Sequence, residues 1–437
     1  MAVDLGERPI RLVVVDDDLR RTRLTVFFRI VLAVPLLVWV WLRGIAAFVA
    51  AFVLWLAVLV QREGPGNVHE FVSNYVRYAT QVGAYVLLAA DRYPWFRVHD
   101  DYPVDVRVAP PAPQSRWTAF FRLFLAIPAV LLSTALGGGF AMSPSGGWGS
   151  RGNGQATFYS TSLSVAGVAA AAAFLLWFVA LVRGAASRGL RDLVVYALGY
   201  SAQASGYLLL VTGRYPSSDP GLVEPSSELP EHPVRIVVTD ELRRTRVTVF
   251  FRLFLALPHI IWLLMWSVVA FFVTLAAWIV ALATGRVPVP LHRFLAAYVR
   301  YTVHLTAFVT VMGARFPGFT GKAGSYRIDV EIDPPERQHR LKTLFRLFLA
   351  WPALVVSSAL DGALLVVWLL AWWASLVTGR MPEGLRNLGA SCLRYAAQTR
   401  AYLVLLTDRY PYAAPVLEGR APPVPAAPPL PVAGDAF

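Results

Sequence analysis

The chain has 437 residues, of which 57% are hydrophobic and only 15% charged, and its mean hydropathy is +0.53. Soluble domains are about half apolar and about a quarter charged, so this composition excludes an ordinary soluble protein and indicates a membrane protein. Cys392 is the only cysteine, which excludes an intramolecular disulfide and a cysteine metal cluster. The net charge of +13 is almost all arginine, and no basic stripe with interleaved aromatic residues predicts nucleic-acid binding.

A Phe-Arg pair, with a proline six residues after the arginine, recurs four times along the chain. The arginines of the first and third copies are 223 residues apart and those of the second and fourth are 224 apart, so the chain is also a duplicated pair. The copies read FRIVLAVP, FRLFLAIP, FRLFLALP and FRLFLAWP, and their arginines are Arg29, Arg122, Arg252 and Arg346.

These copies predict a mainly α integral membrane protein made of four tandem units. A polar linker is expected between the second and third units, and a disordered proline-rich tail after the fourth. The predicted units are 8–97, 101–216, 233–318 and 325–412, the linker is 217–232 and the tail is 413–437.

Each unit is predicted to begin with a short β-strand, because apolar and polar residues alternate there. A strand left alone would not be stable, so strands in one compartment are expected to pair. The four runs are PIRLVVV (9–15), YPVDVRV (102–108), HPVRIVV (232–238) and YRIDVEI (326–332).

A long apolar stretch follows, and in the second unit it is interrupted by a glycine- and serine-rich insertion, 137–162. Such a sequence is typical of a loop, and it falls midway along the stretch. We therefore predict that every stretch forms a transmembrane helical hairpin. The tips of the other three hairpins would lie at Arg43-Gly44, Trp266-Ser267 and Asp361-Gly362.

The last segment of a unit carries an Arg-Tyr pair, at Arg77, Arg300 and Arg394, and the second unit has Gly199 instead of the arginine. A second polar residue follows each arginine at i+4, which places both on one helix face. The pattern favours an amphipathic helix that lies at the membrane interface with its arginine towards lipid headgroups.

The arginines and lysines outside the apolar segments discriminate between two topologies. If only the hairpins cross, giving eight crossings, 30 of these charges lie on one side and two, Arg43 and Arg151, on the other. If the last segment also crosses, giving twelve, the charges divide equally. The bias favours eight crossings, with strands, linker and tail in the cytoplasm of a bacterial cell. The arms are short for two full crossings, so a re-entrant hairpin is an alternative.

Three sets of recurring residues are candidates for function. The Phe-Arg arginines and the Arg-Tyr arginines could contact an anionic headgroup or solute, or could simply snorkel from helix ends to the interface. The prolines remove a backbone donor and predict helix kinks. These prolines are Pro35, Pro128, Pro258 and Pro352. No HExxH, phosphate loop, GxSxG or paired intramembrane carboxylate is present, so we predict no enzyme activity, no metal site and no cofactor.

The assembled motifs resemble the bacterial membrane family catalogued as domain of unknown function 4389. The resemblance rests on FRLFLALPH, on Gly-Arg-x-Pro, on Arg-Tyr and on AYLVLLTDRYP (Ala401–Pro411), and it is best in the third and fourth units. The second unit departs most, with its insertion and its missing arginine. The resemblance implies a membrane-embedded domain often found in tandem, and it carries over no activity and no site residues.

The expected function is a non-catalytic membrane module that binds anionic lipid or a partner protein. The expected partner is therefore the lipid bilayer, anionic lipids included, and nucleic acid is not expected. Internal duplication and proline-broken helices leave open a transporter or channel for an anionic or lipidic solute.

Overall fold

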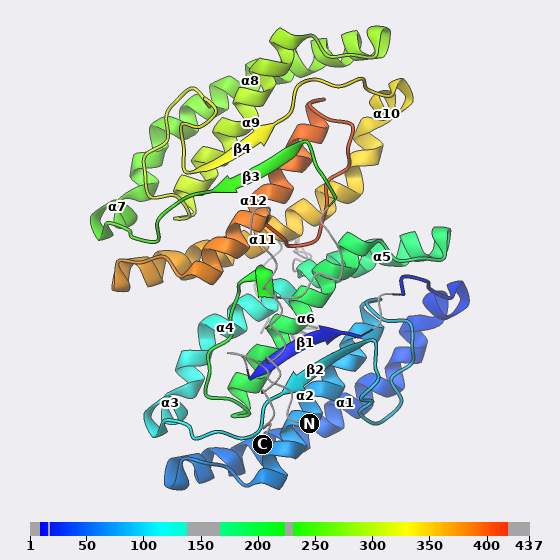
Figure 1. Ribbon diagram of the computed structural model, residues 1–437, viewed down its shortest axis with the longest axis vertical. Helices are drawn as coiled ribbons and strands as arrows, with labels where there is room; N and C mark the ends of the chain where they lie inside the picture. The colour runs from blue at the N-terminus through cyan, green and yellow to red at the C-terminus, as the bar shows by residue number, and fades with distance from the viewer. Residues whose placement is uncertain (1–8, 16–17, 138–166, 223–229, 418–437) are drawn as a thin grey trace, which may run out of the picture.

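The computed structural model describes residues 9–15, 18–137, 167–222 and 230–417 (Figure 1). Helices dominate these residues, and the strands are short. In chain order the elements are β1 (Ile10–Val14), α1 (Arg23–Gln61), α2 (Gly66–Val86), β2 (Val104–Val108), α3 (Arg116–Phe120), α4 (Arg122–Gly137), α5 (Val168–Arg183), α6 (Arg188–Leu208), η1 (Pro220–Leu222), β3 (Val234–Val238), α7 (Arg246–Phe250), α8 (Arg252–Thr284), α9 (Val289–Val309), β4 (Ile328–Ile332), α10 (Arg340–Leu344), α11 (Arg346–Thr378) and α12 (Glu383–Leu403).

The four predicted strands form, and they pair as two antiparallel ribbons, β1 with β2 and β3 with β4. Leu12 lies opposite Val106 and Ile236 lies opposite Val330, so the apolar residues of both strands share the face that packs on helices. Each ribbon therefore takes one strand from each of two neighbouring predicted units, which ties those units together.

The hairpins predicted in the first, third and fourth units are wrong, because α1, α8 and α11 are continuous helices of 39, 33 and 33 residues. The expected tip pairs, such as Arg43-Gly44, lie inside these helices. The apolar stretches contain no cluster of glycine, proline and serine that would end a helix, so backbone bonding continues through them. In the second predicted unit α4 ends at Gly137 and α5 begins at Val168, and the rest of the insertion lies outside the described residues.

The helices form one continuous row, seen from edge to edge in Figure 1. The long helices α1 and α8 lie at the two edges, and α11 packs against α4 and α5 in the middle. The 21-residue helices lie between the long ones, and the ribbons cover them on one face. The order along the row is α1, α2, α6, α4 with α5, α11, α12, α9, α8.

The long helix α8 touches its neighbours through a narrow stripe of mostly small residues. In α8 the buried residues include Ala256, Ala270, Ala277 and Ala281, and alanine lets two helices approach closely within a membrane. Most other side chains of α8 are apolar and exposed. Soluble proteins rarely expose an apolar surface of this size, so the surface indicates contact with lipid. Among the described residues, α1, α8 and α11 are long and apolar enough to cross a membrane.

The expected interfacial position of the Arg-Tyr segments stays a prediction. These segments are the helices α2, α6, α9 and α12, and they are largely buried between long helices and ribbons. Parts of the expected tail and linker pack against the helices. Ala413 and Ala414 of the expected tail are buried, and η1 of the expected linker packs against α12.

His232, two residues before β3, should make stability depend on pH. It is only 5% exposed, and its Nδ1 accepts the Val234 N–H at 3.1 Å. Burial, reinforced by Arg394 and Arg409, lowers the pKa of His232 to about 4. The unfolded chain binds the proton near pH 6.5, so folding stability is complete above that pH and is lost as the pH falls towards 4, by about 3 kcal/mol.

Thermal unfolding in detergent between pH 7 and pH 4 measures this loss. Tyr102 and Tyr326 hold the equivalent place before β2 and β4, so His232→Tyr is the matched control and should flatten the pH dependence over that interval. An equally steep dependence in the variant would show that another group titrates.

Candidate functional site

The Phe-Arg arginines are the most regular feature of the fold. Each is only 2% exposed and reaches the end of the 21-residue helix in its own predicted unit. Arg29 donates to Tyr85 O (2.7 Å) and Ala90 O (3.0 Å), and Arg122 donates to Tyr207 O and Thr212 O. We call this contact the arginine clamp, and its members are Arg29, Arg122, Arg252 and Arg346.

The clamp adds a donor to carbonyl groups in the last helical turn and in the loop after it, where the regular helical hydrogen bonds end. The chain turns there through a non-glycine residue with positive φ: Leu88, Leu210, Val311 or Leu405. An aromatic ring lies beneath each guanidinium, at 4.4 to 4.6 Å from its carbon, and adds a cation–π contact. These rings belong to Tyr85, Tyr207, Phe308 and Tyr402.

The four clamps differ in the anionic or amide group that completes them. Arg29 pairs with Asp91 at 2.6 Å, Arg346 pairs with Asp408, and Arg122 donates to Gln114 Oε1 at 2.7 Å. Arg252 donates only to Gly313 O, at 3.1 Å, and its Nε and Nη1 atoms have no partner among the described residues. Ala314 stands at the position that corresponds to Asp91 and Asp408 in the other units. The Arg252 clamp therefore lacks a carboxylate and is the weakest of the four.

Burial and internal partners decide what these arginines can do. A guanidinium that is 2% exposed and bonded to helix-end carbonyls does not reach a headgroup at the surface. Their predicted contact with an anionic ligand stays a prediction, and the geometry favours a structural role.

Arg77 and Arg300 point to the ribbons rather than outward, and Arg394 points to the segment after α12. Arg77 pairs with Asp105 of β2 at 2.5 Å, and Arg300 donates to Val330 O of β4 at 2.9 Å. Arg394 donates to the carbonyls of Tyr412 and Ala414. The polar face of each helix therefore anchors the strand-bearing segments.

The polar residues four positions after the Arg-Tyr arginines also contact the ribbons. Gln81 donates to Asp105, Gln398 donates to Val234 O, and His304 lies 2.7 Å from Asp329. Burial opposes ionisation of Asp329, but the hydrogen bonds from His304 and from two backbone N–H groups outweigh it and lower its pKa. Gly199, the exception, lies against Leu12 of β1, where an added Cβ would approach to 3.3 Å.

The four prolines lie inside α1, α4, α8 and α11, and the helices continue through them. Each proline leaves the carbonyl four residues earlier without its usual donor. The predicted kinks stay predictions. The four carbonyls belong to Val31, Phe124, Phe254 and Phe348.

Reciprocal contacts join the long helices of two neighbouring predicted units at both ends. Arg23 donates to Val182 O at the end of α5, while Arg116 donates to Val60 O at the end of α1. Arg246 and Arg340 do the same between α11 and α8. We call these four meeting points the junctions, and Figure 1 shows two of them where α7 meets the end of α11 and where α10 meets the end of α8.

A tryptophan strengthens every junction. Trp55 and Trp177 donate to Ala119 O and Val26 O, and Trp278 and Trp372 donate to Thr343 O and Val249 O, at 2.9 to 3.2 Å. The sequence holds the signal for these residues. The tryptophan always follows the clamp arginine by 26 residues, or by 55 where the insertion intervenes. The junction arginine always lies six residues before the clamp arginine.

Exposed basic residues gather at the junctions. One cluster lies where the backbones of Arg243 and Arg380 form an isolated β-bridge. A second lies where Arg286 and Arg337 form another. Large exposed apolar side chains, such as Phe251 beside the first cluster, adjoin them. The exposed basic residues of the four junctions are Arg20, Arg23 and Arg183; Arg62 and Arg116; Arg243, Arg246 and Arg380; and Arg286, Arg337, Arg340 and Lys342.

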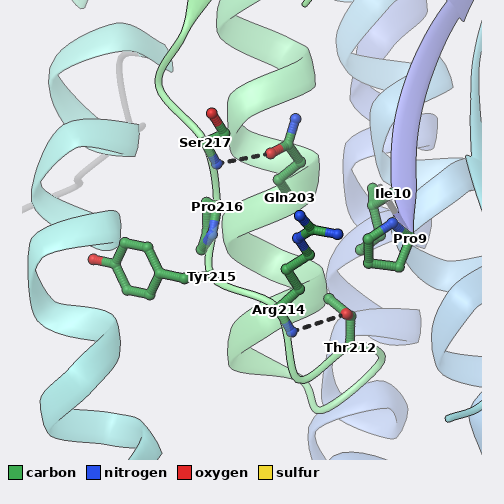
Figure 2. Close-up of a pocket in the computed structure, with 8 residues that line it drawn as sticks. All are labelled: Pro9, Ile10, Gln203, Thr212, Arg214, Tyr215, Pro216 and Ser217. Atoms are coloured by element: carbon green, nitrogen blue, oxygen red, sulfur yellow. Dashed lines mark hydrogen bonds between the residues drawn. The ribbon is translucent and has the colours of Figure 1, made fainter. Parts of the chain in front are cut away.

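A polar cavity of about 180 Å³ lies between the start of β1 and the loop after α6 (Figure 2). Figure 2 shows Arg214 reaching between Gln203 and Ile10, while Tyr215 points away towards α4. Gln203 accepts the Ser217 N–H at 3.0 Å. Pockets for drug-sized ligands measure about 300 to 1,000 Å³, so this cavity suits at most a small polar guest. Within the described residues no group of histidine, cysteine and carboxylate side chains could hold a metal.

Three stretches of the chain match the family described as Domain of unknown function (DUF4389): residues 23–97, 246–320 and 340–414. Together they cover about half of the chain and confirm the resemblance in tandem copies. No curated protein and no solved structure matches.

Removing a clamp arginine should destabilise the fold more where the arginine makes more interactions. We expect Arg346→Ala to lower the free energy of unfolding by about 3 to 5 kcal/mol, because it breaks a buried ion pair. Arg252→Ala should lower it by only about 2 kcal/mol, since one hydrogen bond to a charged group is lost. Unfolding in one detergent measures both. Equal stability with weaker lipid binding would instead assign these arginines to a headgroup.

Proposed function

Since this chain belongs to the family described as Domain of unknown function (DUF4389), whose description assigns no activity, we propose its function from its geometry. It is a non-catalytic module of the bacterial cell membrane that binds anionic lipid. Its helix row is seated in lipid, and its ribbons and tail face the cytoplasm.

The region between the first two family matches is, in this proposal, a fourth and diverged copy. Arg122 contacts carbonyls 85 and 90 residues later, and Arg29 contacts carbonyls 56 and 61 residues later. Both offsets differ by 29, the number of extra residues in the second unit, which include the insertion 137–162. Measured from the clamp arginine of its own unit, Trp177 lies 29 residues further along the chain than Trp55, and Gly184 lies 29 residues further than Arg62. Shared contacts at a constant offset support common descent of all four units.

The junctions carry the lipid proposal. Each joins two or more exposed arginines to large exposed apolar side chains, so a lipid could place its phosphate on the guanidinium groups and its chains on the helices. A basic residue near an anionic membrane surface contributes about 1 kcal/mol. The buried clamps take no part, because protein carbonyls occupy them.

A matched pair of double variants tests this proposal. Arg243→Gln with Arg380→Gln removes two charges from one junction, and Arg97→Gln with Arg107→Gln removes two exposed charges elsewhere. The first variant should weaken anionic lipid binding at that junction by about 2 kcal/mol, about 30-fold, and the second should leave it unchanged. Native mass spectrometry with one dilute anionic and one zwitterionic lipid counts the retained molecules.

Equal retention of anionic lipid by all three proteins would contradict the proposal. Anion flux through proteoliposomes of the wild-type chain would instead support the transporter alternative.

A further inference from the structure

We propose that the long helices lie in the plane of the membrane, within one leaflet, and that both ribbons lie on the water side of the helix row. The chain would then be embedded in one leaflet without crossing the bilayer. This inference rests on the proposed membrane seating, and it replaces the predicted crossings with a single immersed face.

Helix length is the first argument. The 33 residues of α8 and α11 extend about 50 Å, and the 39 residues of α1 about 58 Å. A 50 Å helix would have to tilt by about 53° to fit within a hydrocarbon core of about 30 Å, whereas membrane-spanning helices tilt by about 0 to 40°.

The charges at the helix ends are the second argument. Arg243 and Arg246 lie at the first end of α8, and Arg286 lies at its other end, beside Arg337 and Arg340. A crossing helix would place these two clusters on opposite sides of the membrane and remove any positive-inside bias. A helix in the membrane plane brings both to the same headgroup layer.

The position of the ribbons is the third argument. Arg43 lies midway along α1 and over Tyr78 of α2, and the neighbouring Arg77 pairs with Asp105, the second residue of β2. The first ribbon thus lies level with the middle of α1, and Figure 1 shows both ribbons between the ends of the long helices.

Crossing helices would therefore hold both ribbons at the bilayer centre. Arg107 and Glu331 are exposed there, and a charge at that depth costs about 3 kcal/mol. A two-stranded ribbon also has open edges, whose backbone groups find no partner in hydrocarbon. With the ribbons on the water side, both difficulties disappear.

The in-plane arrangement also fits the leaflet. A helix row is about 10 to 12 Å thick, and one leaflet offers about 15 Å of hydrocarbon. Lipid chains would cover the apolar side chains that the row leaves exposed. Examples along α8 are Phe254, Ile261, Met265, Phe272 and Ile279.

Single cysteines introduced into the full chain test the orientation. The native Cys392 is 1% exposed, so a membrane-impermeant maleimide should not reach it. The positions are Arg243→Cys and Arg286→Cys at opposite ends of α8, Arg107→Cys on a ribbon, and Met265→Cys midway along α8. Intact cells and inverted membrane vesicles present the two sides of the membrane.

We expect Arg243→Cys, Arg286→Cys and Arg107→Cys to be labelled from one and the same side, and Met265→Cys to be labelled only after detergent is added. Labelling of Arg243→Cys and Arg286→Cys from opposite sides would overturn the in-plane orientation and leave the membrane proposal intact. Release of the wild-type chain from membranes by alkaline carbonate would overturn the membrane proposal itself, so the two failures are distinguishable.

Discussion

The fold depends on how helix ends are satisfied where water is scarce. A helix leaves its last four carbonyls without intrahelical donors, and hydrocarbon offers none. Here a guanidinium from the neighbouring long helix joins a carbonyl of the last helical turn to a carbonyl of the loop that follows, as Arg29 does with Tyr85 O and Ala90 O. Arginine suits this task because it presents several donors in a plane and keeps its charge when buried. Every short helix is thereby fixed against the long helix of its own predicted unit.

The clamp explains why the units occur in pairs. One long helix and one short helix held by a clamp still expose the ends of the long helix and one edge of a single strand. The neighbouring unit satisfies both: Trp55 and Trp177 exchange contacts across the junctions, and β1 and β2 complete one ribbon. Since these contacts are reciprocal, the pair rather than the single unit is the smallest part that satisfies its own backbone.

Much of this architecture could be predicted from the sequence, because local pattern determines it. Alternation predicted the four strands, and the repeat predicted where equivalent residues would recur. The hairpins could not be predicted correctly, because the insertion of one unit does not mark a break in the others: Arg43-Gly44 and Asp361-Gly362 lie inside continuous helices. The roles of the clamp arginines are equally hidden, since the carbonyls that they bind lie 56 or more residues away, at helix ends and in the loops after them, whose positions only tertiary packing sets.

The divergence of the copies shows which contacts the fold can lose. The Arg-Tyr arginine is dispensable in the second unit, because Leu12 packs directly on Gly199 and fills the space that a side chain would take. The carboxylate of the clamp is dispensable in the third, where Arg252 keeps one carbonyl and the ring of Phe308. The clamp arginine itself and the junction tryptophan are present in all four. A contact that persists through such divergence while remaining buried is explained by folding, and this leaves the exposed junctions as the place where a partner from outside the chain can bind.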